Sequence, residues 1–167
     1  RGEAFITLSD FEALNQKLQE AGERTYLNPR NTAAGSLRQL DSSLTASRPL
    51  TWFCYAVVAS SSDVLLPQTQ WELLNLLRQW GFPVSDYSVY AADFETALSI
   101  CAERLPRRDV LNFEADGMVI KINNLRLADS LGFVGKDPRG ALALKYPARE
   151  VTTRLLEIRT NVGRTGV

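Results

Sequence analysis

Hydrophobic residues recur at intervals of three and four in segment 8–22, and this spacing predicts an amphipathic helix. Phe11, Leu14 and Leu18 fall on one face of that helix. Ser9 with Glu12 is typical of a capping box at its start, and Gly22 predicts its end.

Two further segments have the same helical periodicity. Segment 69–82 carries a capping box at Thr69 and Glu72 and a stop at Gly81. Segment 93–105 ends before a proline, and its apolar stripe is expected to face the core; the stripe consists of Phe94, Leu98, Cys101 and Leu105.

Segment 28–41 predicts a different kind of helix, short and rich in small residues, which would let another backbone approach closely. Its proline fixes a turn, and Asn31 is expected to be the N-cap.

Strand patterns separate these helices. We expect strands in 1–8, in the β-branched and aromatic stretch 51–59, and at the start of 153–167. Two more strands alternate strictly at period two, 114–125 and 141–148. Each places one lysine, Lys121 or Lys145, on the face opposite its apolar residues.

Strands and helices in this order predict an α+β domain with antiparallel strands and helices packed against them. A chain of 167 residues with 45% hydrophobic and 23% charged residues is ordinary for a globular domain. No apolar run approaches the ~20 residues that span a bilayer, and no signal peptide is evident, so we expect a cytoplasmic protein without a membrane partner. Because Arg1 opens directly on a strand pattern, we expect the chain to be cut from a longer domain.

The chain has no histidine, which excludes Ser-His-Asp and Cys-His nucleophile systems and histidine-ligated zinc. Cys54 and Cys101 lack Cys-x-x-Cys spacing and are expected to be free core thiols. Any chemistry therefore depends on carboxylates, lysines and arginines.

The formal charge is zero but unevenly distributed. Segment 24–48 has four basic and one acidic side chains, and segment 136–164 has seven basic and three acidic. Two cationic segments in a neutral chain are expected where phosphates bind, although both could also be ordinary solvated surface.

If the two lysine strands are neighbours, Lys121 and Lys145 would face a phosphate, with Asp116 and Glu3 available for a ribose or a metal ion. Such a composition suits a nucleotide. A Rossmann site is excluded as the source, because no G-x-G-x-x-G occurs.

Five motifs in order resemble the NAD-dependent DNA ligases of bacteria. They are RGE at 1–3, NPRNTAAGSLRQLD at 28–41, DGMVIKIN at 116–123, LGFVGKDPRGALALKYPA at 131–148 and VGRTG at 162–166. The resemblance implies an antiparallel-sheet, ATP-grasp-like nucleotidyltransferase (adenylation) domain, truncated at its N-terminus, over 1–150. It also implies that 151–167 are a linker and the beginning of an OB-fold.

The resemblance further implies a reaction. In the family a lysine attacks the α-phosphorus of NAD and keeps AMP, the AMP moves to the 5′-phosphate of a nick, and the 3′-hydroxyl displaces it. Such transfer needs mainly positioning and charge stabilisation, which lysine, arginine and Mg²⁺ supply without histidine. NAD, Mg²⁺ and nicked double-stranded DNA would be the ligands, in replication and repair. The family would be monomeric and located with the bacterial nucleoid, with zinc only in a finger that this chain lacks.

By the same resemblance, Asp116 and Lys145 are catalytic, Lys145 near the α-phosphate and Asp116 orienting the metal. The nucleotide would contact Glu3 at its ribose, Lys121 and Arg108 at phosphate, and Gly117 and Val119 near adenine. Arg30, Arg38 and Arg139 would engage phosphate of the nucleotide or of DNA. For Arg108 the neighbouring Arg107 could take the role instead, and Gly140 stands where the family usually has tryptophan.

The Lys-x-Asp-Gly motif of the nucleophile does not occur in the 167 residues. We therefore expect the chain alone to be inactive in nick sealing. Two alternatives stay open: a nucleic-acid-binding module with a degenerate nucleotide pocket, and an ATP-dependent relative of the ligases.

Overall fold

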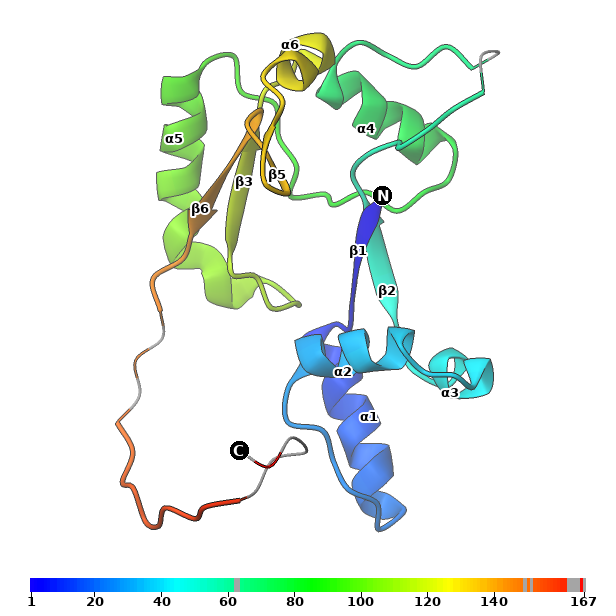
Figure 1. Cartoon of the computed structure of the whole chain (residues 1–167), viewed down its shortest axis with the longest axis vertical. Helices are drawn as coiled ribbons and strands as arrows, with labels where there is room; N and C mark the ends of the chain where they lie inside the picture. Colours follow the sequence, from blue (N-terminus) through cyan, green and yellow to red (C-terminus); the bar gives the residue numbers. More distant parts are fainter. Residues whose placement is uncertain (62–63, 149, 151, 162–165, 167) are drawn as a thin grey trace.

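The computed structural model describes residues 1–61, 64–148, 150, 152–161 and 166. Its elements form three small antiparallel sheets with helices around them, in agreement with the predicted α+β class (Figure 1). In chain order they are β1 (Gly2–Phe5), α1 (Leu8–Glu20), α2 (Pro29–Leu37), α3 (Ser42–Ala46), β2 (Thr51–Cys54), α4 (Gln70–Gln79), α5 (Phe94–Arg104), the 3₁₀ helix η1 (Leu105–Val110), β3 (Gly117–Lys121), α6 (Leu125–Ser130), β4 (Phe133–Val134), β5 (Asp137–Pro138) and β6 (Ala141–Lys145).

Each sheet is a pair of strands: β1 with β2, β3 with β6, and β4 with β5. The β4–β5 hairpin lies between the two lysine strands, and Gly135, with φ of 62°, supplies the left-handed turn conformation that the hairpin needs. The β3–β6 pair stands apart from the β1–β2 pair in Figure 1, with α5 on one side and α6 above it.

A small core lies between β2 and α4. Its buried members are Cys54, Leu74, Leu77 and Val84, with Trp71 packed against them. Thr69 is confirmed as the N-cap of α4, since its hydroxyl accepts from the Glu72 amide at 3.3 Å and donates to the Glu72 carboxylate at 2.7 Å. Cys54 and Cys101 are free and buried, as predicted.

A second cluster is aromatic and joins β1 and β2 to the loop that precedes β3. The Phe113 ring lies 5.3 Å from Phe5, 5.8 Å from Phe53 and 5.7 Å from Tyr87, centroid to centroid. Tilted and edge-to-face rings at these separations are favourable aromatic contacts.

Two predicted N-caps were wrong. Helix α1 is capped by Thr7 and not by Ser9, because Thr7 is extended and accepts from the Asp10 amide, which places Ser9 inside the first turn. The Ser9 amide donates instead to the side chain of Asn112, 103 residues away. Helix α2 is capped by Asn28 and not by Asn31, because Pro29 fits the first helical position and lets the helix begin earlier.

The strand predicted over 51–59 is limited to Thr51–Cys54, because Cys54 pairs with Gly2, the first residue of the antiparallel partner strand β1. The predicted stripe of α5 is half wrong. Phe94 and Leu98 are 53% and 42% exposed, whereas Ala97 and Cys101 are buried. The helix therefore turns Ala97 toward the core in place of the larger Leu98.

The strand expected at the start of 153–167 is absent from residues 152–161, which contain neither helix nor strand. The VGRTG motif at 162–166 lies outside the described residues except for its last glycine.

Candidate functional site

The β3–β6 pair brings the two predicted lysine strands side by side. Its register sets Gly117 opposite Lys145 and Lys121 opposite Ala141. Residues directly opposite in an antiparallel pair point to the same face, so both lysines share one face and lie at its two ends. Four residue steps separate the ends, about 14 Å at 3.4 Å per residue.

Asp116 joins three elements at the Lys145 end. Its Oδ2 accepts from Lys145 Nζ at 2.9 Å and from Arg30 on α2 at 3.5 Å, and its main-chain oxygen accepts from the Tyr146 amide at 2.9 Å. The hydrogen bond from Lys145, together with the positive charges of Lys145 and Arg30, lowers the pKa of the Asp116 carboxyl below 3.8. Three residues predicted from separate motifs, 30, 116 and 145, therefore meet.

Lys121, at the other end, lies over the ring of Tyr55, with Nζ 4.5 Å from the ring centroid. The residue retains exposed surface, but protein atoms crowd its ammonium group and lower its pKa from 10.5. Sequence reasoning missed Tyr55, which was assigned only to a buried strand. Nothing in the local pattern indicates that it faces a lysine 66 positions further along.

The neighbouring strand β6 leaves no room for a side chain at Gly117. A Cβ at this position would lie 2.4 Å from the main-chain oxygen of Leu144, a distance at which one of the two must shift. Val119, on the lysine face, is 59% exposed and leaves that face open between its two ends.

Arg108 and Arg107 have different partners. The guanidinium of Arg108 lies 5.3 Å from the ring centroid of Tyr146 and donates to the Pro147 oxygen at 3.3 Å, next to the end of β6. Arg107 instead pairs with Glu103 at 3.4 Å, on the same helical surface. Arg108 therefore contacts the two residues that directly follow Lys145 in the chain, whereas Arg107 pairs with a residue of its own helical segment.

Three other predicted residues are exposed and outside this cluster. Glu3 lies on β1 opposite Phe53, Arg38 ends α2, and Arg139 follows β5. In the described part of the chain no hydrogen bond or ion pair joins their side chains to Asp116.

Gly140 is buried against α6, where an added Cβ would lie 2.7 Å from the Cβ of Ala128. The structure therefore has no room for a larger side chain at this position unless α6 moves. Gly140, which stands where the resemblance leads us to expect tryptophan, thus allows its backbone to pack closely against Ala128 of α6.

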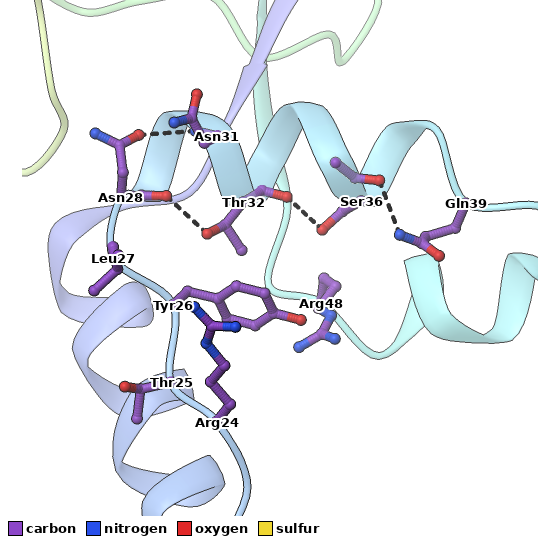
Figure 2. A pocket seen from close by; sticks show the side chains of 11 residues that line it. Arg24, Thr25, Tyr26, Leu27, Asn28, Asn31, Thr32, Ser36, Gln39 and Arg48 are labelled. Carbon is purple, nitrogen blue, oxygen red and sulfur yellow. Dashed lines mark hydrogen bonds between the residues drawn. The ribbon is translucent and has the colours of Figure 1, made fainter. Parts of the chain in front are cut away.

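A cavity of about 500 Å³ opens on the other side of α2. Figure 2 shows Tyr26 beneath the helix with Arg24 and Arg48 around its ring, and the Arg48 guanidinium lies 4.8 Å from the ring centroid. Polar side chains line the roof of the cavity, namely Asn31, Thr32 and Ser36 of α2 and Gln39 just after it. Both arginines belong to the cationic segment 24–48, and such a lining suits an anionic group.

Asp116 would offer one carboxylate to a magnesium ion, and two cations already contact its Oδ2. Among the described residues no group of three acidic, cysteine or histidine side chains gathers as a metal site. These surroundings do not form a resident metal site, and a magnesium ion would need phosphate oxygens as its main ligands. Nor does any described helix have the length and apolar content to cross a membrane.

Comparison with known proteins gives a consistent result. The family model described as the NAD-dependent DNA ligase adenylation domain matches residues 1–149. Over its full length the chain is 51% identical to a DNA ligase of Chloroflexus aggregans and 47% identical to one of Trichlorobacter lovleyi, and over 99% of its length it is 51% identical to one of Herpetosiphon aurantiacus. The chain spans about a quarter of the length of these relatives, 24% of each. The chain belongs to the family of NAD-dependent DNA ligase adenylation domains.

Proposed function

We propose that this chain supplies the AMP-binding and phosphate-binding residues of a ligase that seals nicks in DNA, with NAD as the AMP donor. The observation that carries the proposal is the contact of Asp116 with both Lys145 and Arg30, on the strand pair that also presents Lys121. Paired ammonium and guanidinium groups around one carboxylate can hold phosphate oxygens while the carboxylate keeps the cations in place.

In this proposal Lys145 and Asp116 act at the α-phosphate, and Lys121 and Arg108 bind the nucleotide. The open face at Gly117 and Val119, with the Tyr55 ring beside Lys121, offers a surface against which an adenine could stack. Glu3 would bind the ribose, and Arg38 and Arg139 would bind phosphates of the nick. Magnesium would enter with the phosphates.

The nucleophilic lysine has to come from a Lys-x-Asp-Gly motif, which these 167 residues do not contain. We therefore expect no nick sealing by the 167-residue chain alone. The full protein would pass AMP from lysine to the 5′-phosphate of DNA before the 3′-hydroxyl closes the strand, in replication and repair, in the cytoplasm of a bacterium. The division into an adenylation domain at 1–150 and the start of an OB-fold at 151–167 is part of the same proposal.

Covalent adenylation tests the proposal. A longer protein that joins a Lys-x-Asp-Gly segment to this chain is incubated with Mg²⁺ and either NAD or ATP, and the intact protein is weighed. A mass gain of one AMP with NAD but not ATP, lost in Lys145→Ala and Asp116→Ala and kept in the control Arg126→Ala, is expected. A gain with ATP alone would assign the chain to the ATP-dependent relatives, and no gain with either donor would refute the nucleotide site.

A nucleic-acid-binding module is the second candidate, and the cavity beside Tyr26 favours it. The guanidinium groups of Arg24 and Arg48 lie beside α2, along a face of the helix that does not contact Asp116. Phosphate contacts of this kind give salt-sensitive binding without sequence preference. Duplex DNA binding by the 167-residue chain, with no nucleotide binding, would select this candidate.

A further inference from the structure

Helices α1 and α4 begin in the same way. A threonine caps the third helical residue of each, since Thr7 accepts from the Asp10 amide at 3.1 Å and Thr69 accepts from the Glu72 amide at 3.3 Å. A local cap of this kind leaves the amides of the first two helical residues without an intrahelical partner.

In each helix, a different asparagine from a distant part of the sequence accepts hydrogen bonds from those two amides. The main-chain oxygen of Asn112 accepts from Leu8 at 3.0 Å, and its Oδ1 accepts from Ser9 at 3.1 Å. Asn123 does the same for α4, with its main-chain oxygen accepting from Gln70 at 2.7 Å and its Oδ1 from Trp71 at 2.9 Å. We call Asn112 and Asn123 the distal caps.

The distal caps flank one short segment. Asn112 precedes and Asn123 follows β3, so the residues between them include Asp116 and Lys121. In the described part of the chain no strand of the β1–β2 pair is hydrogen-bonded to the β3–β6 pair. The placement of β3 against the other half of the molecule therefore depends on contacts outside the sheets, among them these main-chain and side-chain hydrogen bonds.

On the Asn123 side the contacts close a ring. Gln70, whose amide donates to Asn123, also donates from Nε2 to the main-chain oxygen of Tyr55 at 2.9 Å. The Tyr55 ring lies under Lys121 Nζ, and Lys121 is two residues before Asn123. The ring therefore connects the start of α4 to Lys121 through Tyr55.

We propose that Asn112 and Asn123 are positioning residues that fix Asp116 and Lys121 by capping α1 and α4 from a distance. The inference rests on the proposed function only in treating Asp116 and Lys121 as site residues. Asn112 also donates from Nδ2 to the Ser9 hydroxyl at 3.0 Å, so its side-chain amide uses both of its ends. Neither asparagine touches the cations of the Asp116 cluster, and the effect of each is indirect.

The chain offers a matched control. Asn124, next to Asn123, caps α6 locally by accepting from the Leu127 amide at 2.9 Å. Asn124→Ala and Asn123→Ala each remove one asparagine cap from a helix, but only Asn123 belongs to the ring that reaches Lys121. Asn123→Asp keeps the Oδ1 acceptor and serves as the rescue.

The experiment is performed on the 167-residue chain without nucleotide, with lysine side chains labelled for NMR and amide exchange measured at Trp71. We expect Asn123→Ala to return the Lys121 titration toward its ordinary range and to speed exchange at Trp71 at least tenfold. Asn124→Ala should leave both readouts as in the parent, and Asn123→Asp, which adds a charge near Lys121, should leave the exchange at Trp71 as in the parent. Equal behaviour of Asn123→Ala and Asn124→Ala would overturn the inference.

If Asn123→Ala does not fold, Gln70→Ala takes its place, because it cuts the link to Tyr55 and leaves the helix cap intact. It should shift the Lys121 titration in the same direction, and an unchanged titration would overturn the proposal. For Asn112 the readout is the titration of Asp116, which should change in Asn112→Ala and not in Asn124→Ala, the local cap of α6. Because no readout uses a nucleotide, failure of the AMP site would appear separately, as absent adenylation with normal titrations.

Discussion

Asp116 accepts a hydrogen bond from Lys145 at 2.9 Å across the end of the β3–β6 pair, and Arg30 approaches the same oxygen at 3.5 Å. The pair links the residue that enters β3 to the residue that ends β6. It is exposed, so its value lies in fixing the direction of the two side chains more than in stability.

We expect Lys145→Ala to raise the pKa of Asp116 back toward 3.8, and to raise it more than Arg30→Ala does, because the hydrogen bond from Lys145 is the largest cause of the shift. NMR titration of labelled aspartates measures both variants. A larger pKa change in Arg30→Ala would contradict this order and would make Arg30 the main partner of Asp116 in solution.

The same shift gives a pH dependence of stability. Because the folded pKa of Asp116 is depressed, its contribution is present above 3.8 and is lost as the pH falls through the folded value. Asp116→Asn should flatten the acid limb of unfolding free energy against pH, with a change under about 1 kcal/mol for an exposed pair. Denaturant unfolding between neutral and acid pH checks this, and parallel curves would contradict it.

Lys121 should give a pH dependence of stability with the same sign, at alkaline pH. Its pKa is lowered in the folded chain, so the unfolded chain binds more protons between the folded value and 10.5, and stability rises with pH across that window. Lys121→Met should be more stable than the parent at neutral pH and should lose this rise. Lys136→Met, in the exposed turn between β4 and β5, is the matched control. If the rise of stability with alkaline pH were unchanged in Lys121→Met, the lowered pKa of Lys121 would not be its cause.

Gly117→Ala should destabilise the chain, because its Cβ would lie 2.4 Å from the main-chain oxygen of Leu144. Overpacking of this kind costs about 1–3 kcal/mol. The control is Gly35→Ala in α2, where a Cβ meets nothing within 4 Å and the change should stabilise by about 0.5–1 kcal/mol. Thermal and denaturant unfolding of the two variants measure the difference, and destabilisation by both would show that the β3–β6 contact is not the cause.

Arg24→Ala with Arg48→Ala should weaken binding to duplex DNA and reduce its dependence on salt. Two lost phosphate contacts lower the slope of log affinity against log salt by about 1.8. Fluorescence anisotropy at several salt concentrations measures the slope, with Arg126→Ala on α6 as the control. An unchanged slope would mean that the cavity beside Tyr26 does not meet the DNA backbone.

The sequence by itself determined the elements whose signals are local. Alternation at period two set the polar face of β3 and β6, and the Thr69–Glu72 box placed the start of α4, because these patterns depend on neighbours a few residues apart. The motifs also identified the family, and with it Asp116, Lys121 and Lys145 as candidates.

Only the tertiary structure decided which residues meet. Asn112 came to accept from the Ser9 amide at the start of α1, Tyr55 came to lie under Lys121, and the main-chain oxygen of Leu144 leaves no room for a Cβ at Gly117. Each contact joins residues that are far apart in the chain, and no local periodicity encodes it. Their positions follow from strand register and from free helix amides that need a partner, both of which exist only once the chain has folded.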